Sequence, residues 1–209
     1  MSRRRIQVSS VLMVVASFVA ACGAPRPVKY YVIDVPPAPV PAVAAPLPIT
    51  LLVGRFTASH LYHDDRLVYG SGPVQLGTYE YDRWAEAPAD MVQDLLIAQL
   101  RRTGQYSTVS RVTSSVRGDY VVRGQLLEMY GVDQPSLVAR FSLQLELYDP
   151  VGRATLWNQT YTHDEPVQGK TVPNIVEAMD RNVGEGLQQL SAGLAQYFAA
   201  HPPQSQGAK

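Results

Sequence analysis

Apolar and polar residues alternate along several short segments of the chain, which is the pattern of β-strands that bury one face. The most regular segment spans residues 137–147, and its apolar positions are Leu137, Ala139, Phe141, Leu143, Leu145 and Leu147. Shorter segments at 106–109, 120–126 and 154–162 are predicted to be strands as well. Residues 49–53 are continuously apolar, which predicts a strand that is covered on both faces.

Two segments on either side of a glycine-rich turn predict a β-hairpin. Residues 66–69 and 74–79 flank the sequence Gly70-Ser71-Gly72-Pro73. Nearer the N-terminus, residues 29–35 predict another short strand. The proline-rich segment at 36–48 follows it and is expected to form a loop, because proline lacks the amide donor that a helix or a central strand needs.

Two further segments space their apolar residues as helices do. The first begins at Pro88 and ends before Gly104, with a stripe of Met91, Val92, Leu95, Leu96 and Leu100. The second begins near residues 171–173, with a stripe of Val176, Met179, Val183, Leu187, Leu190, Leu194 and Tyr197. We expect the second stripe to cover the sheet, and a coiled-coil seam for a partner is the alternative.

The order of these elements predicts an α+β fold. We expect a mixed, mostly antiparallel sheet with two helices packed on one face. A single domain is predicted to span residues 29–200, including the loop at 36–48. Residues 201–209 are polar and contain prolines, so they are expected to form a disordered tail.

Residues 1–21 have the composition of a signal peptide. Three consecutive arginines, Arg3 to Arg5, precede an apolar run at 11–21, whose helical length of roughly 16 Å is about half of a bilayer core. Small residues then precede Cys22, the only cysteine of the chain, as lipoprotein processing requires. We predict cleavage before Cys22, a diacylglycerol on its thiol and an N-acyl group, expected to be palmitate. An ordinary secretory signal with a free Cys22 is the alternative.

The residue after the cysteine and the next few residues bear on where the domain sits. Gly23 is not acidic, which favours an anchor in the outer membrane with the domain on its periplasmic face. If residues 29–35 join the sheet, only the tether at 22–28 is free, and it spans about 20 Å. If they stay loose, the 27 residues from 22 to 48 could reach roughly 80 Å in polyproline form.

Charge and cysteine content exclude several classes of protein. The 18 basic and 18 acidic residues give no net charge, so the chain lacks the basic surface of a nucleic-acid binder. A single cysteine excludes an intrachain disulfide and a cysteine-rich zinc site. The signal peptide contains three of the basic residues and no acid, which leaves the mature chain at −3. This charge gives the folded part no electrostatic reason to lie on anionic lipid, so we expect the lipid anchor to hold it at the membrane.

The sequence contains no convincing catalytic or metal-binding set. A Gly-x-Ser-x-Gly elbow and a phosphate-binding loop are both missing, so we expect neither an enzyme nor a cofactor other than the lipid. The run from His60 to Asp65 has two histidines and two carboxylates, but it is predicted to be a loop, and we expect no metal there. The run from His163 to Glu165 could pair a base with an orienting carboxylate, but no nucleophile accompanies it.

The hairpin region is rich in tyrosine and arginine, two residue types that dominate protein–protein contacts. The candidate partner-binding residues are Tyr62, Arg66, Tyr69, Tyr79, Tyr81 and Arg83. The same rings could instead cover the core beneath the hairpin, and both interpretations stay open. Trp84 is expected to be structural and to anchor the hairpin to the helix that follows.

Taken together, these segments resemble the ABC-type transport auxiliary lipoprotein family, the PqiC/YmbA-like lipoproteins. The segments that carry the resemblance, in chain order, are the lipobox at Cys22, Lys29-Tyr30-Tyr31-Val32-Ile33-Asp34, Ile49 to Val53 after the proline-rich gap, Asp65-Arg66-Leu67-Val68-Tyr69, Tyr81-Asp82-Arg83-Trp84-Ala85-Glu86-Ala87-Pro88, Tyr120-Val121-Val122-Arg123-Gly124 and the final amphipathic helix. The chain departs from the family at Tyr62-His63, where Tyr-Leu is commoner.

The resemblance implies a non-catalytic outer-membrane component that docks a periplasmic MCE-domain protein served by an ABC permease and its ATPase. It also implies that residues 30–34 join the sheet. An alternative is a lipoprotein activator of a peptidoglycan synthase, whose tether at 29–35 would have to be disordered to cross the cell wall. A third possibility, direct lipid carriage, requires a sizeable apolar pocket between the sheet and the helices.

Overall fold

The computed structural model describes residues 26–37, 45–70, 74–113, 117–133 and 136–203. The elements, in chain order, are β1 (Lys29–Tyr31), β2 (Leu47–Val53), β3 (Thr57–Ala58), the 3₁₀ turn η1 (His60–Tyr62), β4 (Arg66–Gly70), β5 (Leu76–Trp84), α2 (Pro88–Thr103), β6 (Tyr106–Arg111), β7 (Tyr120–Asp133), β8 (Leu137–Asp149), β9 (Ala154–Pro166) and α3 (Val172–Ala200). Every predicted strand and helix is present in this order. The strands β5, β7 and β9 extend several residues beyond their predicted ends.

All strands of the described residues belong to one sheet, in which β7 is the central strand. One edge of β7 is shared by β2, β3 and β4, and its other edge pairs with β8. The ladders β4–β5, β7–β8 and β8–β9 are antiparallel, whereas β1–β5, β2–β6, β2–β7, β3–β7 and β4–β7 are parallel. The predicted α+β class with a mixed sheet is confirmed, and the parallel pairings are more numerous than predicted.

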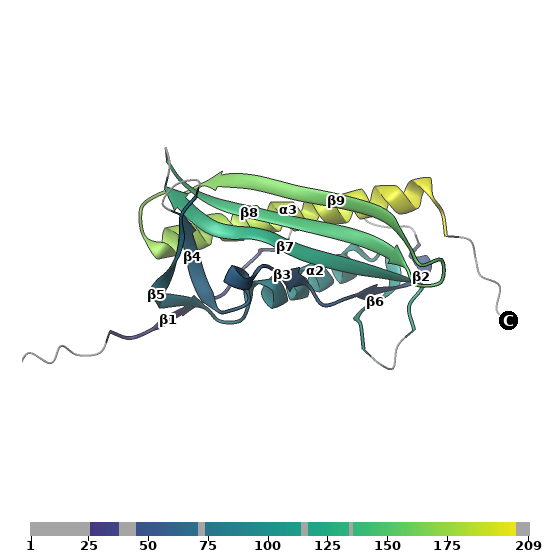
Figure 1. The fold of residues 1–209 in the computed structure, drawn as a ribbon. Coiled ribbons are helices and arrows are strands. Elements are labelled where there is room, and N and C mark those ends of the chain that lie inside the picture. The colour runs from purple at the N-terminus through teal and green to yellow at the C-terminus, as the bar shows by residue number, and fades with distance from the viewer. Residues whose placement is uncertain (1–25, 38–44, 71–73, 114–116, 134–135, 204–209) are drawn as a thin grey trace, which may run out of the picture.

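Both helices lie on the same side of the sheet (Figure 1). The helix α3 runs along β8 and β9, and α2 lies beside β6 and contacts α3. The apolar residues of β8 that face the helices, from Ala139 to Leu147, are at most 1 % exposed. Gly186 of α3 permits this approach, since a Cβ atom there would lie 2.7 Å from the ring of Tyr161.

Local signals define both ends of these helices. Pro88 lies in the first turn of α2, and Gly104 ends the helix in the left-handed conformation, with φ of 62°. At the start of α3, the side chains of Thr171 and Asn174 form a capping box. The predicted stripe of α3 is buried from Val176 to Leu194, and Tyr197 at its end is half-buried. The stripe therefore packs on this chain's own sheet and does not form a coiled-coil seam.

The N-terminal strand joins the sheet, as predicted, but only residues 29–31 pair. Pairing stops because its partner β5 ends at Trp84, after which the backbone amide of Ala85 bonds to the carbonyl of Tyr31 (2.7 Å). The residues after β1 nevertheless remain packed against the domain, since Ile33 is only 8 % exposed. The predicted signal peptide, Cys22, most of the loop at 36–48 and the end of the predicted tail lie outside the described residues. In the described part, no helix is long and apolar enough to cross a membrane.

Candidate functional site

The candidate partner-binding residues lie on and beside the β4–β5 hairpin, but on two different faces of the sheet. Arg66 and Arg83 are direct cross-strand partners, and Tyr30 of β1 is the partner of Arg83 on its other side. Strand alternation places these three side chains on the face opposite Tyr31 and the buried Trp84. Tyr81, two positions before Arg83, shares their face. Arg66, Tyr81 and Arg83 therefore form one surface, which we call the arginine–tyrosine face.

An ion pair fixes one of the two arginines of this face. The Asp65 carboxylate accepts a hydrogen bond from the Arg83 guanidinium, with Oδ1 and Nη1 2.8 Å apart. The backbone carbonyl of Asp65 also accepts from the amide of Trp84 (2.6 Å). Arg66 is exposed and has no ion pair with any described residue. The face therefore presents one unneutralised cation beside a fixed one.

The ring of Tyr81 lies between charged side chains. The Arg26 guanidinium stands over this ring, 5.2 Å from its centre. A hydrogen bond to Glu80 raises the pKa of the Tyr81 hydroxyl above its ordinary value. The hydroxyl stays protonated at neutral pH and donates its proton to Glu80, so its oxygen can accept a hydrogen bond from a partner.

Tyr69 and Tyr79 point to the helix side of the hairpin. Their rings pack against each other with centres 4.9 Å apart. Both line a hollow of about 340 Å³ together with Gly131, Lys170 and Ile175. Gly77 makes room for this pair, because a Cβ atom there would lie 2.7 Å from the Tyr69 ring. Burial raises the pKa of the Tyr79 hydroxyl. These two rings are half-buried and are separated from the arginine–tyrosine face by the sheet.

Tyr62 and Trp84 are both core residues, each 3 % exposed. Burial raises the pKa of the Tyr62 hydroxyl to about 12, partly offset by a hydrogen bond from the Met129 backbone. The placement of Trp84 agrees with its expected structural role. Tyr62 leaves almost no ring surface for a partner in this conformation.

The segment that leads from the membrane tether to the body is held by several side-chain contacts. The Tyr31 hydroxyl donates to Oδ1 of Asp82 (2.9 Å). The backbone amide of Asp34 donates to Oδ1 of Asp180 on α3 (3.2 Å). Val35 packs against Gly184, where an added Cβ would lie 3.0 Å from its side chain. Residues 29–35 are therefore attached to the domain from end to end.

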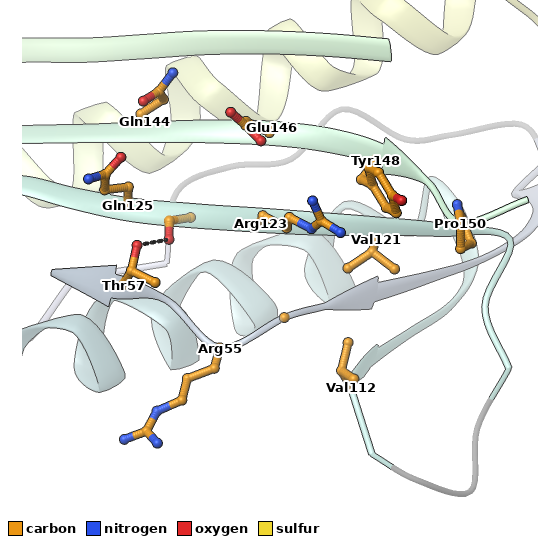
Figure 2. A pocket seen from close by; sticks show the side chains of 12 residues that line it. Arg55, Thr57, Val112, Val121, Arg123, Gln125, Gln144, Glu146, Tyr148 and Pro150 are labelled. Carbon is orange, nitrogen blue, oxygen red and sulfur yellow. Dashed lines mark hydrogen bonds between the residues drawn. The ribbon is translucent and has the colours of Figure 1, made fainter. Parts of the chain in front are cut away.

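A groove of about 570 Å³ lies on the open side of the sheet, away from the helices (Figure 2). Its floor consists of outward side chains of β7 and β8, among them Gln125, Gln144 and Glu146. The Arg123 guanidinium stacks on the Tyr148 ring at 3.6 Å from its centre. Arg55, at the rim, points away from Arg123 (Figure 2). The groove opens to solvent on the outer face of the sheet, whereas lipid carriage would require an apolar pocket between the sheet and the helices.

The two histidine-containing motifs are engaged in local contacts. The His63 ring bonds to the carbonyl of Ala58 (3.1 Å), and within the described ranges no three His, Cys, Asp or Glu side chains are placed to hold a metal ion. Asp164 accepts two hydrogen bonds from Arg140, at 2.6 and 2.7 Å. Glu165 accepts one from Arg181 (2.8 Å). Both carboxylates beside His163 are thus held by arginines.

Sequence reasoning missed two features of this end of the molecule. The tyrosines and arginines of the hairpin region were grouped as one set of candidate contacts. A bulge in the β4–β5 ladder instead places Tyr79 and Tyr81 on opposite faces, and the alternation of apolar and polar residues does not reveal that bulge. Sequence reasoning also gave no role to Val28, Tyr30 and Val32, which are exposed by 41, 64 and 61 %. Their spacing at every second position was the available signal.

One comparison with known proteins identifies a family, and another identifies solved structures with a similar fold. A family model described as "ABC-type transport auxiliary lipoprotein component" matches residues 31–192. Protein XCC0632 from Xanthomonas campestris, of family DUF330, is 18 % identical, with a TM-score of 0.75 over 83 % of this chain and 98 % of its own. A second solved structure, titled as an uncharacterized protein, is 11 % identical with a TM-score of 0.62, over 81 % and 99 %. No curated protein matches the chain.

Proposed function

The chain belongs to the ABC-type transport auxiliary lipoprotein family, and from that premise we propose that it is a non-catalytic accessory that docks a periplasmic MCE-domain protein to the outer membrane. Acyl groups on Cys22 hold it on the periplasmic face of that membrane. The MCE protein is served by an ABC permease and its ATPase, and the lipid cargo passes through that assembly. The observation that carries the proposal is the family match, which extends over most of the chain.

The arginine–tyrosine face is the proposed contact surface. Two arginines opposite each other on neighbouring strands repel, and Asp65 bonds to only one of them. A carboxylate on the partner that reaches Arg66 would remove this repulsion. The Tyr81 ring adds apolar area and a hydroxyl oxygen that can accept a hydrogen bond, at low conformational cost. We therefore expect an acidic patch on the surface of the MCE protein that meets this face.

The short tether supports this function over activation of a peptidoglycan synthase. An activator would need residues 29–35 free in order to cross the cell wall, whereas here they bond to Asp82 and Asp180. With 29–35 attached, only the residues up to 28 separate the lipid from the domain, about 20 Å at full extension. That distance suits a protein that receives its partner close to the membrane surface.

Site-specific crosslinking of the lipidated chain in cells tests the proposal. A photo-crosslinking amino acid replaces Arg66 in one strain and Arg117, an exposed arginine of the β6–β7 connection, in a control strain. Mass spectrometry then identifies the crosslinked proteins. We expect an MCE-domain protein from position 66 and not from position 117. A penicillin-binding protein without transporter subunits at position 66 would overturn the proposal in favour of the activator.

A further inference from the structure

The edge strand β1 carries an unusual row of exposed apolar side chains. Val28, Tyr30 and Val32 account for three of the nine large apolar side chains that are exposed in the described residues, and they fall within five positions. Between them, Tyr31 and Ile33 turn inward, Tyr31 to bond Asp82 and Ile33 into the core. The three exposed side chains thus occur at every second position, with Tyr30 in β1 and Val28 and Val32 directly before and after the strand. We call Val28, Tyr30 and Val32 the apolar row.

We propose that the apolar row is a second membrane contact, which rests on the bilayer that holds the lipid of Cys22. This inference depends on the lipidation in the proposed function. Val28 follows Cys22 by six residues, so its backbone stays within about 20 Å of the anchoring cysteine. A surface confined so close to a bilayer meets lipid far more often than it meets any dissolved protein.

The chemistry of the row fits the interfacial region of a bilayer and not its hydrocarbon core. Tyrosine prefers the level of the lipid headgroups, because its ring is apolar and its hydroxyl is polar. Arg26 precedes the row and has no ion pair with a described residue, so it can approach lipid phosphates. The unpaired backbone groups on the free edge of β1 can bond to headgroups or water at that depth.

The apolar row adjoins the proposed docking surface, because Tyr30 pairs with Arg83 and lies on the same face of the sheet. The strand β1 lies at one end of the molecule and α3 ends at the other (Figure 1). The apolar row belongs to the rim strand, whereas Arg66, Tyr81 and Arg83 belong to the two strands inside it. Contact of the rim with lipid would orient the domain and hold the arginine–tyrosine face just above the headgroups.

Depth-dependent quenching on the full lipidated chain tests this contact. Because Cys22 is the only cysteine, acylation leaves no free thiol, and Val32→Cys introduces a single site for an environment-sensitive dye. Val151→Cys is the matched control, since Val151 is 77 % exposed in the β8–β9 turn, at the far end from β1 (Figure 1). Both proteins are reconstituted in phosphatidylethanolamine–phosphatidylglycerol vesicles that contain a headgroup-level nitroxide lipid.

We expect a blue shift and the loss of most of the fluorescence at position 32, with little change at position 151. No quenching at position 32, or equal quenching at both positions, in a protein whose mass confirms lipidation would overturn the contact alone. A blue shift at position 32 that appears only after the MCE protein is added would reassign the row to a protein interface. An unacylated mass with a second dye on Cys22 would instead contradict the lipidation on which the proposed function rests.

Discussion

Arg66 and Arg83 lie directly opposite each other on β4 and β5, and Asp65 neutralises only Arg83. Like charges at such positions destabilise a sheet, and opposite charges stabilise it, by about 0.2–1 kcal/mol. Arg66→Glu should therefore leave the melting temperature unchanged or raise it slightly. Capture of the MCE protein from detergent-solubilised membranes should fall strongly, because the partner's acidic patch would then meet a carboxylate.

The matched control for this substitution is Arg117→Glu, which makes the same charge change at an exposed position of the β6–β7 connection. Capture by Arg117→Glu should equal that of the wild type. Normal capture by Arg66→Glu would show that the arginine–tyrosine face is not the docking surface. A substitution of Tyr69 would be a poorer test, since loss of the Tyr69–Tyr79 ring contact would disturb the hairpin itself.

Tyr31→Ala should loosen the segment at 29–35. The change removes the hydrogen bond to Asp82 and the half-buried ring. A hydrogen bond contributes about 1 kcal/mol and the ring adds to it, so local opening should become roughly tenfold more frequent. Hydrogen exchange of the peptide that contains residues 29–35 measures this.

Tyr30→Ala is the natural comparison, because Tyr30 is the neighbouring tyrosine but is 64 % exposed and points outward. Exchange of the same peptide should stay close to the wild-type rate. If the wild-type peptide already exchanged as fast as an unfolded chain, residues 29–35 would belong to a long tether. Activation of a peptidoglycan synthase would then be the better-supported function.

Asp180→Asn should stabilise the protein at neutral pH. Burial raises the pKa of the Asp180 carboxyl to about 6, and the nearby Asp34 and Glu177 add to the effect. The folded state therefore binds a proton more tightly than the unfolded state, and the free energy of unfolding falls as pH rises from about 4 to 6. Asparagine keeps an oxygen that accepts from the Asp34 amide and carries no charge.

The gain should be on the order of 1 kcal/mol at pH 7.5, because solvent screens a carboxylate that is only half-buried. It should disappear towards pH 4, where aspartate is protonated in the folded protein. Thermal melts of both proteins at the two pH values provide the measurement. An advantage that is the same at both pH values would mean that the charge of Asp180 is not its cause.

Gly186→Ala should destabilise the protein although alanine favours helices. The added methyl group would lie 2.7 Å from the Tyr161 ring and 3.1 Å from Phe141, in a region with no free space. Overpacking of this kind costs about 1–3 kcal/mol, more than the helix propensity returns. Glu185→Ala changes the exposed neighbouring position and should be close to neutral in chemical unfolding. Equal stability of the two variants would contradict the close packing of α3 on β8 and β9.

The elements of this fold could be predicted because each depends on neighbouring residues. The alternation from Leu137 to Leu147 identifies β8, and the stripe from Val176 to Leu194 identifies the buried face of α3. The partners of the strands could not be predicted in the same way. Nothing in residues 49–53 reveals that β2 lies between β6 and β7 and is parallel to both.

The candidate site was harder to predict than the fold, for a related reason. Tyr62 and Tyr81 are the same residue type in the same polar region, yet one is buried against β7 and the other stands beside Arg26. A bulge decides which side of the sheet Tyr79 and Tyr81 occupy, and the opposition of Arg66 and Arg83 depends on the register after that bulge. These are consequences of pairing between strands, which composition and spacing do not specify.

The central place of β7 has a consequence for the order of folding. The strands β2, β3 and β4 all pair in parallel with β7, which follows them by dozens of residues. A chain that emerges from a translocation channel N-terminus first cannot pair all three of these strands with β7 until residue 133 has passed through. Until then, the edges of these early strands that pair with β7 stay free and open to mispairing, which makes this topology slow to fold. Periplasmic chaperones that shield exposed strands would be needed most in that interval.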